Sequence, residues 1–395
     1  MKTLLFNFPL FFLHFYLIFS TNQVYCQEFN VKNCTEALEI NPQHHKANSI
    51  KEAMAELIQQ AVPGTVAAIY DRYGWWVYAD GLAKIEDQTP MQICHLQYLQ
   101  SISKTYMAVV IMKLWEEGKI DLDKPITQFL PERISNKITN AQNITVKMLL
   151  NHTSGIAEYN YAPAYVTKLL QEPLYLFKAE EYLEYIEGKK QDFEPGSKYS
   201  YRNVNYVLLA LMADHITGDH QKYMEEVIFK PLGLKQTYYG IKQGNTYENR
   251  LVNSYWDRHS NYILENISVL QNTNVASMIG DDGIITTPQE AILFLKGLVE
   301  GKLVAPKTLE MMQEWVLNKK GEPTYGLGLA STKFLGETAY GHSGGGLGSG
   351  CQLYYFPSKG IYMFLAINLG TVTNSPIHEK TTKTIEKVYQ GILGE

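Results

Sequence analysis

The sequence predicts an α/β fold of the α+β type, in which an antiparallel β-sheet flanked by helices lies beside a mainly helical subdomain. Residues 65–70 and 75–85 are rich in Val, Ile, Trp and Tyr and flank Arg72-Tyr73-Gly74, a pattern typical of a β-hairpin. Strand-like segments return only after Tyr325, whereas residues 101–300 show mainly helical spacing of their apolar residues. An early hairpin can join late strands in one sheet, and helices can then cover its faces.

Apolar spacing and end signals predict the individual elements. Residues 48–62 have the spacing of a helix, and a strongly apolar helix over residues 203–217 is stopped by Gly218. Thr287 begins another helix, because a proline follows it directly and Glu290 stands three residues after this cap. The remaining expected elements are helices over residues 145–150 and 377–392, and strands over residues 326–333, 337–341, 352–355 and 361–367.

Composition excludes several classes of function. The chain has 395 residues, of which 45% are hydrophobic and 19% charged, and a formal net charge of -5. Lys and Arg are dispersed, so nothing indicates a nucleic-acid footprint or a polybasic membrane patch. The four cysteines, Cys26, Cys34, Cys94 and Cys351, have neither metal-type spacing nor a dense disulfide framework, and no H-E-x-x-H pattern occurs. We therefore expect neither a metal nor an organic cofactor.

The first residues predict export. Residues 1–26 combine a positive start at Lys2 with an apolar stretch over residues 4–19, and Cys26 is a permissible cleavage point, as in a signal peptide. A membrane anchor is the alternative, but the interrupted stretch is short of the roughly 20 residues that a span needs. Lipid attachment at Cys26 is a minor third option. We expect the protein to be periplasmic or secreted.

A polar leader over residues 27–47 precedes one folded domain over residues 48–395. Its α/β part is expected at about residues 48–100 and 300–395, and its helical part at about residues 101–299. A groove between the two parts is where a ligand site is expected.

Ser101 and Lys104 are the first candidate catalytic pair. A serine hydroxyl is a poor nucleophile unless a base lies beside it. Residues three apart share one face of a helix, so Ser-x-x-Lys at a helix start places an amine next to the hydroxyl. The apolar run over residues 107–114 predicts a buried helix, and burial favours the neutral form of lysine. The alternative is a capped core helix without a catalytic role.

Ser101-Ile-Ser-Lys-Thr-Tyr106, with the downstream run over residues 114–125, resembles the serine β-lactamase and penicillin-binding-protein superfamily. The most similar branch contains class C β-lactamases, D-alanyl-D-alanine carboxypeptidases, D-aminopeptidases and related esterases. The resemblance covers about residues 48–393 and implies a β-lactamase/transpeptidase-like fold. Segments at residues 151–155, 280–284 and 325–329 also look like landmarks of this family.

The second motif of that family, Tyr-x-Asn, occurs here as Tyr201-Arg202-Asn203 and as Tyr247-Glu248-Asn249. Tyr201 directly precedes the apolar helix over residues 203–217, so a rigid element holds it, as a catalytic group requires. Tyr247 stands in a polar run. We therefore assign the motif to Tyr201 and Asn203, with a hydrogen-bonded core tyrosine as the alternative.

The third motif, Lys- or His-x-Gly, has three candidates. Lys242-Gln243-Gly244 and Lys319-Lys320-Gly321 lie in polar loops, whereas His342-Ser343-Gly344 ends an expected strand. The resemblance implies that His342, Ser343 and Gly344 meet the substrate, and that the backbone N–H groups of Ser101 and Gly345 form an oxyanion hole. Gly345-Gly346 stands where many relatives carry larger residues, which is expected to widen the groove. A neutral histidine binds carboxylates less firmly than lysine.

The resemblance implies a serine hydrolase that forms an acyl-enzyme on Ser101. Lys104 and Tyr201 would share the proton transfers in an order that stays open, Asn203 would orient Lys104 and contact the substrate amide, and His342 would tune Tyr201 or meet a substrate anion. The expected substrates are β-lactams, D-amino-acid peptides or esters, as for a β-lactamase-like or D-alanyl-D-alanine carboxypeptidase-like enzyme. An esterase or D-aminopeptidase on the same scaffold is the alternative, and a catalytically silent protein that binds peptidoglycan or β-lactams is another.

Overall fold

A computed structural model describes residues 39–240 and 248–394, which belong to one compact unit. Several predicted features lie outside the described residues. They are the signal peptide over residues 1–26, most of the polar leader, the Tyr-x-Asn candidate that begins at Tyr247 and the Lys-x-Gly candidate that begins at Lys242. Within the described ranges, none of the helices has the length and apolar character needed to cross a membrane.

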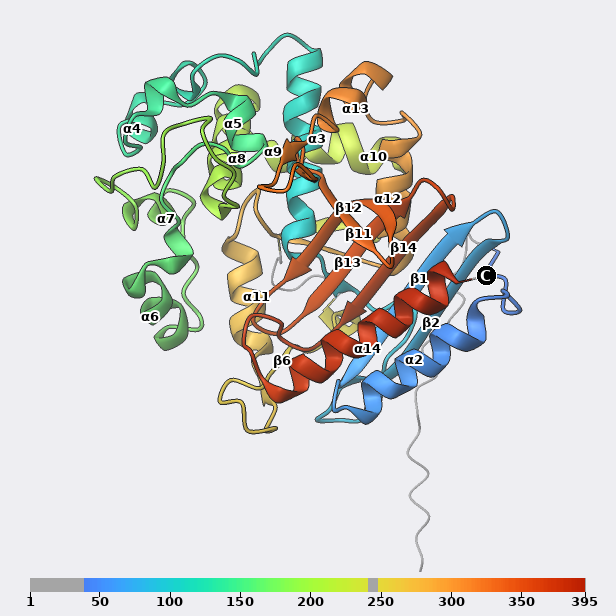
Figure 1. Cartoon of the computed structure of the whole chain (residues 1–395). Helices are drawn as coiled ribbons and strands as arrows, with labels where there is room; N and C mark the ends of the chain where they lie inside the picture. The colour runs from blue at the N-terminus through green and yellow to red at the C-terminus, as the bar shows by residue number, and fades with distance from the viewer. Residues whose placement is uncertain (1–38, 241–247, 395) are drawn as a thin grey trace, which may run out of the picture. The chain divides into compact units, whose positions relative to one another are not determined.

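An antiparallel sheet forms the centre of the fold (Figure 1). In the described part of the chain it has nine strands, in the order β3-β2-β1-β14-β13-β12-β11-β10-β9. These strands are β1 (Gly64–Asp71), β2 (Gly74–Lys84), β3 (Thr89–Pro90), β9 (Val316–Leu317), β10 (Pro323–Tyr325), β11 (Ala330–Phe334), β12 (Glu337–Gly345), β13 (Gly350–Phe356) and β14 (Ile361–Ile367).

The predicted hairpin is confirmed as β1 and β2, and it joins the late strands as expected. β1 pairs antiparallel with β2 on one side and with β14 on the other, where Tyr70 lies opposite Tyr362. Two smaller sheets accompany the main sheet. One contains β4 (Gln97–Tyr98), β8 (Ile284–Thr286) and β5 (Tyr238–Tyr239). The other contains β6 (Tyr255–Trp256) and β7 (Glu265–Asn266).

The remaining regular structure is mainly helical. They are α2 (Ala47–Gln59), α3 (Ser103–Glu116), α4 (Glu132–Ser135), α5 (Val146–Leu150), α6 (Pro163–Gln171), α7 (Glu181–Glu184), α8 (Asn203–Thr217), α9 (His220–Met224), α10 (Lys230–Leu232), α11 (Ser268–Ser277), α12 (Pro288–Val299), α13 (Pro306–Met312) and α14 (Pro376–Leu393). The start of α12 was predicted correctly, because the Thr287 hydroxyl accepts the Glu290 N–H.

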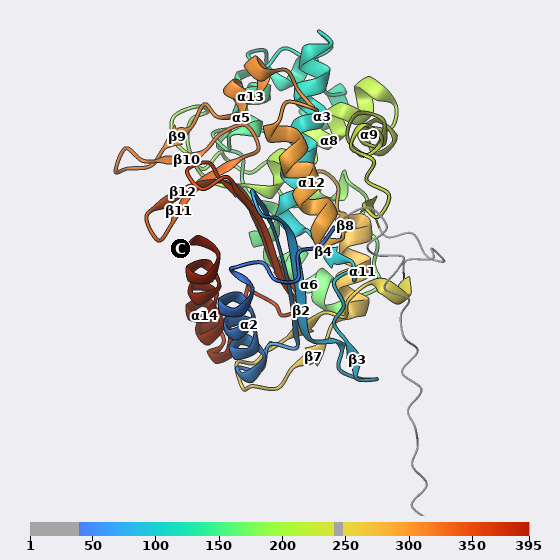
Figure 2. The same ribbon diagram turned by 90° about the vertical axis from the view of Figure 1, so that its right-hand side faces the viewer.

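The two faces of the sheet bury two separate hydrophobic cores. Side chains alternate along β1, so Val66 and Ala68 join one core while Ala67 and Ile69 join the other. Helices α2 and α14 cover one face, and α3 and α12 lie on the opposite face (Figure 2). Residues 288–299 were expected in the helical part, but as α12 they pack against β1, β13 and β14 and so belong to the sheet part.

The segment over residues 326–333 is strand only in its second half. β11 begins at Ala330, because Gly328 has a φ of +80° and turns the backbone toward α3. The Thr105 hydroxyl donates to the Gly328 carbonyl at 2.8 Å. A β-carbon on Gly328 would lie 2.1 Å from that of Ala108, so this approach needs glycine.

Candidate active site

Ser101 lies on a 3₁₀ helix, Gln100–Ile102, that leads directly into α3, and Lys104 lies in the first turn of α3. The nearly complete burial of α3 follows from its apolar run and fixes the Lys104 side chain against the core. Lys104 is fully buried, and its Nζ lies 3.0 Å from the Oγ of Ser101. The predicted pairing of hydroxyl and amine on one helix face is therefore present in the structure.

A backbone carbonyl positions the amine. Lys104 Nζ donates to the carbonyl oxygen of Asp281 at 2.8 Å, across 177 positions of sequence. Gly280 allows the turn that presents this carbonyl, because its φ is +76° and a side chain there would meet the backbone of Tyr206. Sequence reasoning marked residues 280–284 as a landmark but did not identify this contact.

Burial lowers the pKa of Lys104, although the carboxyl groups of Asp281, Asp282 and Glu158 oppose this shift. Burial raises the pKa of Glu158 to about 7. Burial also raises the pKa of Asp282 to about 7, and the charge of Asp281 is the second cause of that rise. The Tyr159 hydroxyl donates to Oδ2 of Asp281 at 2.9 Å. These carboxyl groups were missed from the sequence, where two adjacent aspartates between apolar segments were the available signal.

Tyr201 lies immediately before α8, as expected, and its ring centroid is 5.1 Å from Lys104 Nζ. Burial raises the pKa of the Tyr201 phenol well above its usual value, and the Ser101 hydroxyl opposes that rise. The buried Tyr201 oxygen nevertheless has no hydrogen-bond partner of good geometry among the described residues. The phenol therefore lies close to Ser101.

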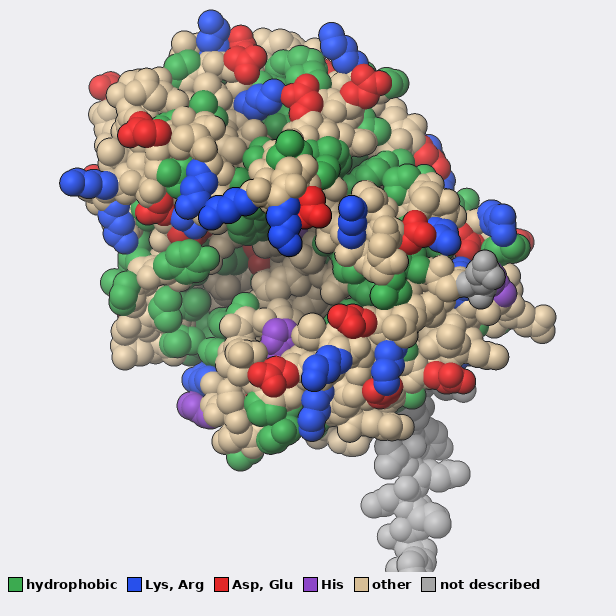
Figure 3. Space-filling view, viewed as in Figure 1, with side chains coloured by type: hydrophobic (Ala, Val, Ile, Leu, Met, Phe, Trp, Pro, Cys, Tyr) green, Lys and Arg blue, Asp and Glu red, His purple; other side chains and the backbone are tan. Residues whose placement is uncertain are grey.

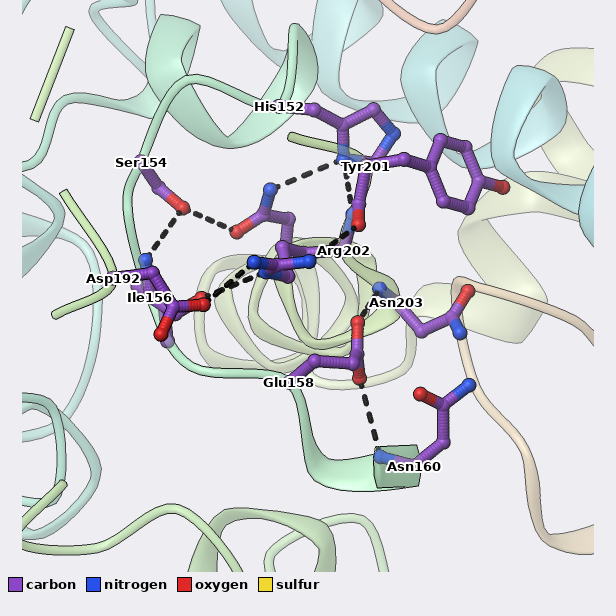
Figure 4. Close-up of polar contacts among 10 residues, drawn as sticks. His152, Ser154, Ile156, Glu158, Asn160, Asp192, Tyr201, Arg202 and Asn203 are labelled. Atoms are coloured by element: carbon purple, nitrogen blue, oxygen red, sulfur yellow. Dashed lines mark hydrogen bonds and ion pairs between the residues drawn. The ribbon is translucent and has the colours of Figure 1, made fainter. Parts of the chain in front are cut away.

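Hydrogen bonds hold the segment around Tyr201 in place (Figure 4). The His152 ring accepts the Arg202 N–H at 3.2 Å, and the Asn203 N–H donates to Glu158. The side chains of Asn160 and Asn203 point toward one another in this view. Lys104 Nζ bonds to Ser101 and Asp281, and no hydrogen bond among the described residues joins it to Asn203, although one had been expected.

His342 is buried, and both of its ring nitrogens have partners. The Nδ1 atom lies 2.6 Å from the Ser343 carbonyl oxygen, and Nε2 lies 2.8 Å from the Tyr325 hydroxyl. Nδ1 therefore donates and Nε2 accepts, which fixes one neutral tautomer. Burial, followed by the charge of Lys104, lowers the pKa of His342 to about 3. This geometry corrects the expected contact with a substrate anion, because no ring nitrogen is available for it.

β12 continues through Gly345, further than predicted. Ser343 and Gly344 border a pocket beside α14, whereas Gly345 borders both that pocket and the cavity that contains Ser101. A β-carbon on Gly346 would lie 2.6 Å from the Gln100 carboxamide, so little room is left beside this glycine. Gln100 occupies this space and donates to the Ser349 hydroxyl at 2.6 Å.

A cavity of about 420 Å³ opens beside Ser101. Ser101, Asn203, Asp281, Asp282 and Gly345 are part of its wall, together with residues of α6 and α11. Figure 3 shows a hollow in this face of the molecule, with hydrophobic side chains gathered beside it. Ser101, Asn203 and Gly345 thus border one cavity, Lys104 lies beside Ser101 and Tyr201, and His342 is not part of the cavity wall.

Comparisons with known proteins agree with this architecture. A family model described as Beta-lactamase matches residues 47–381. A protein of Escherichia coli (strain K12) named as a D-alanyl-D-alanine carboxypeptidase is 26% identical over 304 residues, which are 67% of this chain and 68% of that protein. The chain spans smaller shares, 63% and 52%, of two further curated relatives.

Solved structures share the fold. The D-amino acid amidase from Ochrobactrum anthropi SV3 is similar with a TM-score of 0.76 and 22% identity, covering 88% of this chain and 99% of that one. A D-stereospecific amidohydrolase from Streptomyces sp. is similar with a TM-score of 0.72 and 26% identity, covering 85% and 97%. The chain is a serine hydrolase by fold and family. It belongs to the beta-lactamase family, which confirms the resemblance carried by its motifs.

Proposed function

We propose that this protein hydrolyses amide bonds of small molecules or peptides through an acyl-enzyme on Ser101. The observation that carries the proposal is the 3.0 Å separation of Ser101 Oγ from the fully buried Lys104 Nζ, at the edge of a cavity. A buried amine is neutral more readily than an exposed one, so it can accept the serine proton. The names of the relatives, a D-alanyl-D-alanine carboxypeptidase and two D-specific amidohydrolases, support an amide substrate.

In the proposed first step, Ser101 Oγ bonds to the carbonyl carbon and its proton passes to Lys104 Nζ. The C–N bond then breaks, and the leaving nitrogen receives a proton from the Tyr201 hydroxyl. Water next attacks the ester carbon, the bond to Ser101 Oγ breaks, and the acid product leaves. Protons return from the water to Tyr201 and from Lys104 to Ser101, so the enzyme ends as it began.

The pKa directions support this division of roles between Lys104 and Tyr201. Burial lowers the pKa of Lys104, which favours a neutral base, and raises the pKa of Tyr201, which keeps the phenol protonated. A protonated phenol can donate but cannot serve as the initial base. The backbone N–H groups of Ser101 and Gly345 are proposed as donors to the developing oxyanion. Export through the segment of residues 1–26 also stays a proposal.

The test is active-site labelling. The protein is incubated with a fluorophosphonate and, separately, with a fluorescent penicillin, and the adduct is located by peptide mass spectrometry. We expect a covalent label on Ser101 that is absent from Ser101→Ala. The matched control is Ser103→Ala, which removes the neighbouring hydroxyl that accepts the Ile284 N–H at 3.3 Å. This control should retain the label.

Turnover of p-nitrophenyl esters and p-nitroanilides separates the remaining outcomes. Equal turnover by Ser101→Ala would overturn the acyl-enzyme. Ester turnover with no penicillin adduct would favour the esterase or aminopeptidase alternative, and binding without an adduct or turnover would favour a silent binding protein.

A further inference from the structure

The turn that presents the Asp281 carbonyl to the buried amine of the site is tied at both ends to one segment of the chain. The Gly280 N–H donates to the Tyr239 hydroxyl at 2.6 Å, at the start of the turn. The Gly240 N–H donates to the Gly283 carbonyl at 2.7 Å, at the end of the turn. Both ties come from β5 and the residue that follows it, and β5 pairs with β8, the strand into which the turn leads. The carbonyl therefore lies between two fixed points.

Tyr239 is itself held by a second buried side chain, that of His220. The Tyr239 hydroxyl lies 3.1 Å from Nε2 of His220, and Nδ1 of His220 lies 2.6 Å from Oδ1 of Asp214. The hydroxyl accepts the Gly280 N–H, so its own proton is available for Nε2, and Nδ1 then donates to the carboxylate. This arrangement pairs every donor and assigns one neutral tautomer to His220. These groups thus form one row of hydrogen bonds, in which each donor points away from the turn.

The outer end of this row lies on α8, the helix that begins directly after the Tyr201 segment. Asp214 stands in the last turns of α8, and its side chain is 38% exposed. Its Oδ1 atom also accepts the backbone N–H of His220 at 2.9 Å, where α9 begins. His220 and Tyr239 are only 3% and 7% exposed. The row therefore connects two helices that pack against α3 to a turn at the cavity wall (Figure 1).

The turn depends on outside contacts for its shape. Gly280 and Gly283 have φ values of +76° and +106°, and glycine moves between backbone conformations more easily than other residues. The carbonyl between them accepts from Lys104 Nζ at 2.8 Å. A displacement of about 1 Å at a reacting group can reduce a rate about 10²-fold, so a small movement of this turn affects the base. The loss of a tie should therefore appear in the chemical step.

We propose that Tyr239 and His220 are positioning residues for the acylation of Ser101. They hold the turn so that its carbonyl keeps the Lys104 amine within reach of the serine hydroxyl, and they act only through that amine. In the described part of the chain neither residue belongs to the wall of the cavity, so neither is expected to touch a substrate. This inference rests on the proposed hydrolysis at Ser101 and adds two residues that lie outside the three motifs.

The experiment follows the labelling of Ser101 by a fluorophosphonate at several probe concentrations. It measures the maximal rate of labelling, kinact, and the probe concentration that gives half this rate, KI. Tyr239→Phe removes only the hydroxyl, and we expect kinact to fall about 10- to 100-fold because the turn loses a tie. We expect KI to change less than about twofold, because the groups that contact the probe stay the same. The matched control is Tyr389→Phe, which removes a buried hydroxyl that donates to Gln352 in the core on the opposite face of the sheet and should retain kinact.

Two variants of different chemistry test His220. His220→Leu removes the acceptor for the Tyr239 hydroxyl and should lower kinact as Tyr239→Phe does. His220→Gln supplies a carboxamide oxygen as a new acceptor and should keep kinact within a few fold of wild type. Because both residues act through one row of hydrogen bonds, a double variant with Tyr239→Phe and His220→Leu should be no slower than the slower single variant.

Urea midpoints check that each variant is folded under the labelling conditions, and the variants at either residue test the inference should those at the other fail to fold. Unchanged kinact in Tyr239→Phe and His220→Leu would overturn this inference, as would equally low kinact in His220→Gln and His220→Leu. In both cases the wild-type protein would still be labelled at Ser101. Absence of that label from the wild type would instead reject the proposed function itself, so the two failures are distinguishable.

Discussion

The Nζ atom of Lys104 lies 3.0 Å from Ser101 Oγ and 2.8 Å from the carbonyl oxygen of Asp281. The first contact joins two residues of one helical turn, and the second joins α3 to the turn before β8. The amine is thus held from both sides, and Lys104 is fully buried. Its position depends on the folding of distant segments rather than on the Ser-x-x-Lys spacing alone.

Lys104→Met should remove the base and keep the length of the side chain. We expect kcat/KM to fall about 10²- to 10⁴-fold, the usual contribution of a general base. Protonation of Lys104 is expected to reduce activity on the acid side of the pH–rate profile, and this dependence should be absent from Lys104→Met. Stopped-flow acylation between pH 5 and pH 9 measures both effects.

Lys113→Met is the matched control on the same helix. Lys113 forms an ion pair of 2.7 Å with Glu116 and is partly exposed, so its loss should cost little stability and no acylation rate. Comparable acylation by Lys104→Met and wild type would contradict the role of Lys104.

Glu158→Gln should weaken the pH dependence of stability. The pKa of Glu158 is about 7 in the folded protein and 4.5 as its reference value, which corresponds to about 3 kcal/mol. Because the folded pKa is raised, this contribution to stability is fully present below pH 4.5 and is lost as the pH rises through about 7. Glutamine has no such titration.

Urea unfolding at pH 5 and pH 8 measures this effect. The fall in the free energy of unfolding between the two values should be smaller in Glu158→Gln than in wild type. Glu194→Gln, at an exposed position, serves as the control and should behave like wild type. Identical pH dependence in all three proteins would show that Glu158 does not titrate as a buried group.

Gly344→Ala and Gly345→Ala should differ in stability although they are neighbours on β12. A β-carbon on Gly344 would lie 2.4 Å from the Leu99 carbonyl oxygen, which is backbone and cannot move alone. On Gly345 it would meet only the Thr371 side chain, at 2.8 Å. We expect Gly344→Ala to lose about 1–3 kcal/mol, as for overpacking, and Gly345→Ala to lose less.

The comparison uses urea midpoints together with the rate of Ser101 labelling. Gly344→Ala should also slow labelling, because it displaces the 3₁₀ helix that carries Ser101 away from β12. Equal midpoints for the two variants would disprove the close approach of β12 to Leu99.

Elements with a strong period were predictable from the sequence. The β1–β2 hairpin, α8 and the Thr287 cap of α12 follow from local signals, and the pairing of Ser101 with Lys104 follows from helix geometry. The contact from the Asp281 carbonyl was not predictable, because every residue has a carbonyl and only the tertiary fold selects one. The position of Gln100 over Gly346 was missed for the same reason, since it depends on how two distant segments approach each other.

His342 illustrates a different limit. Its strand and its neighbouring glycines were identified correctly, but a side chain on a strand can point to either face. The Tyr325 hydroxyl, which occupies Nε2, comes from β10, a strand that was not predicted from the sequence. Motif position therefore located the residue without determining which way it faces.

The pairing of β1 with β14 has a consequence for biosynthesis. Tyr70 leaves the ribosome almost 300 residues ahead of its neighbour Tyr362, so at 5–20 residues per second β1 waits on the order of 15–60 s with an open edge. In the sheet, β14 lies between the hairpin and β13. A nascent polypeptide that stops before residue 361 therefore lacks an internal strand of the sheet, not an edge strand. Synthesis through β14 is thus a precondition for completing the sheet that carries β12 and β13.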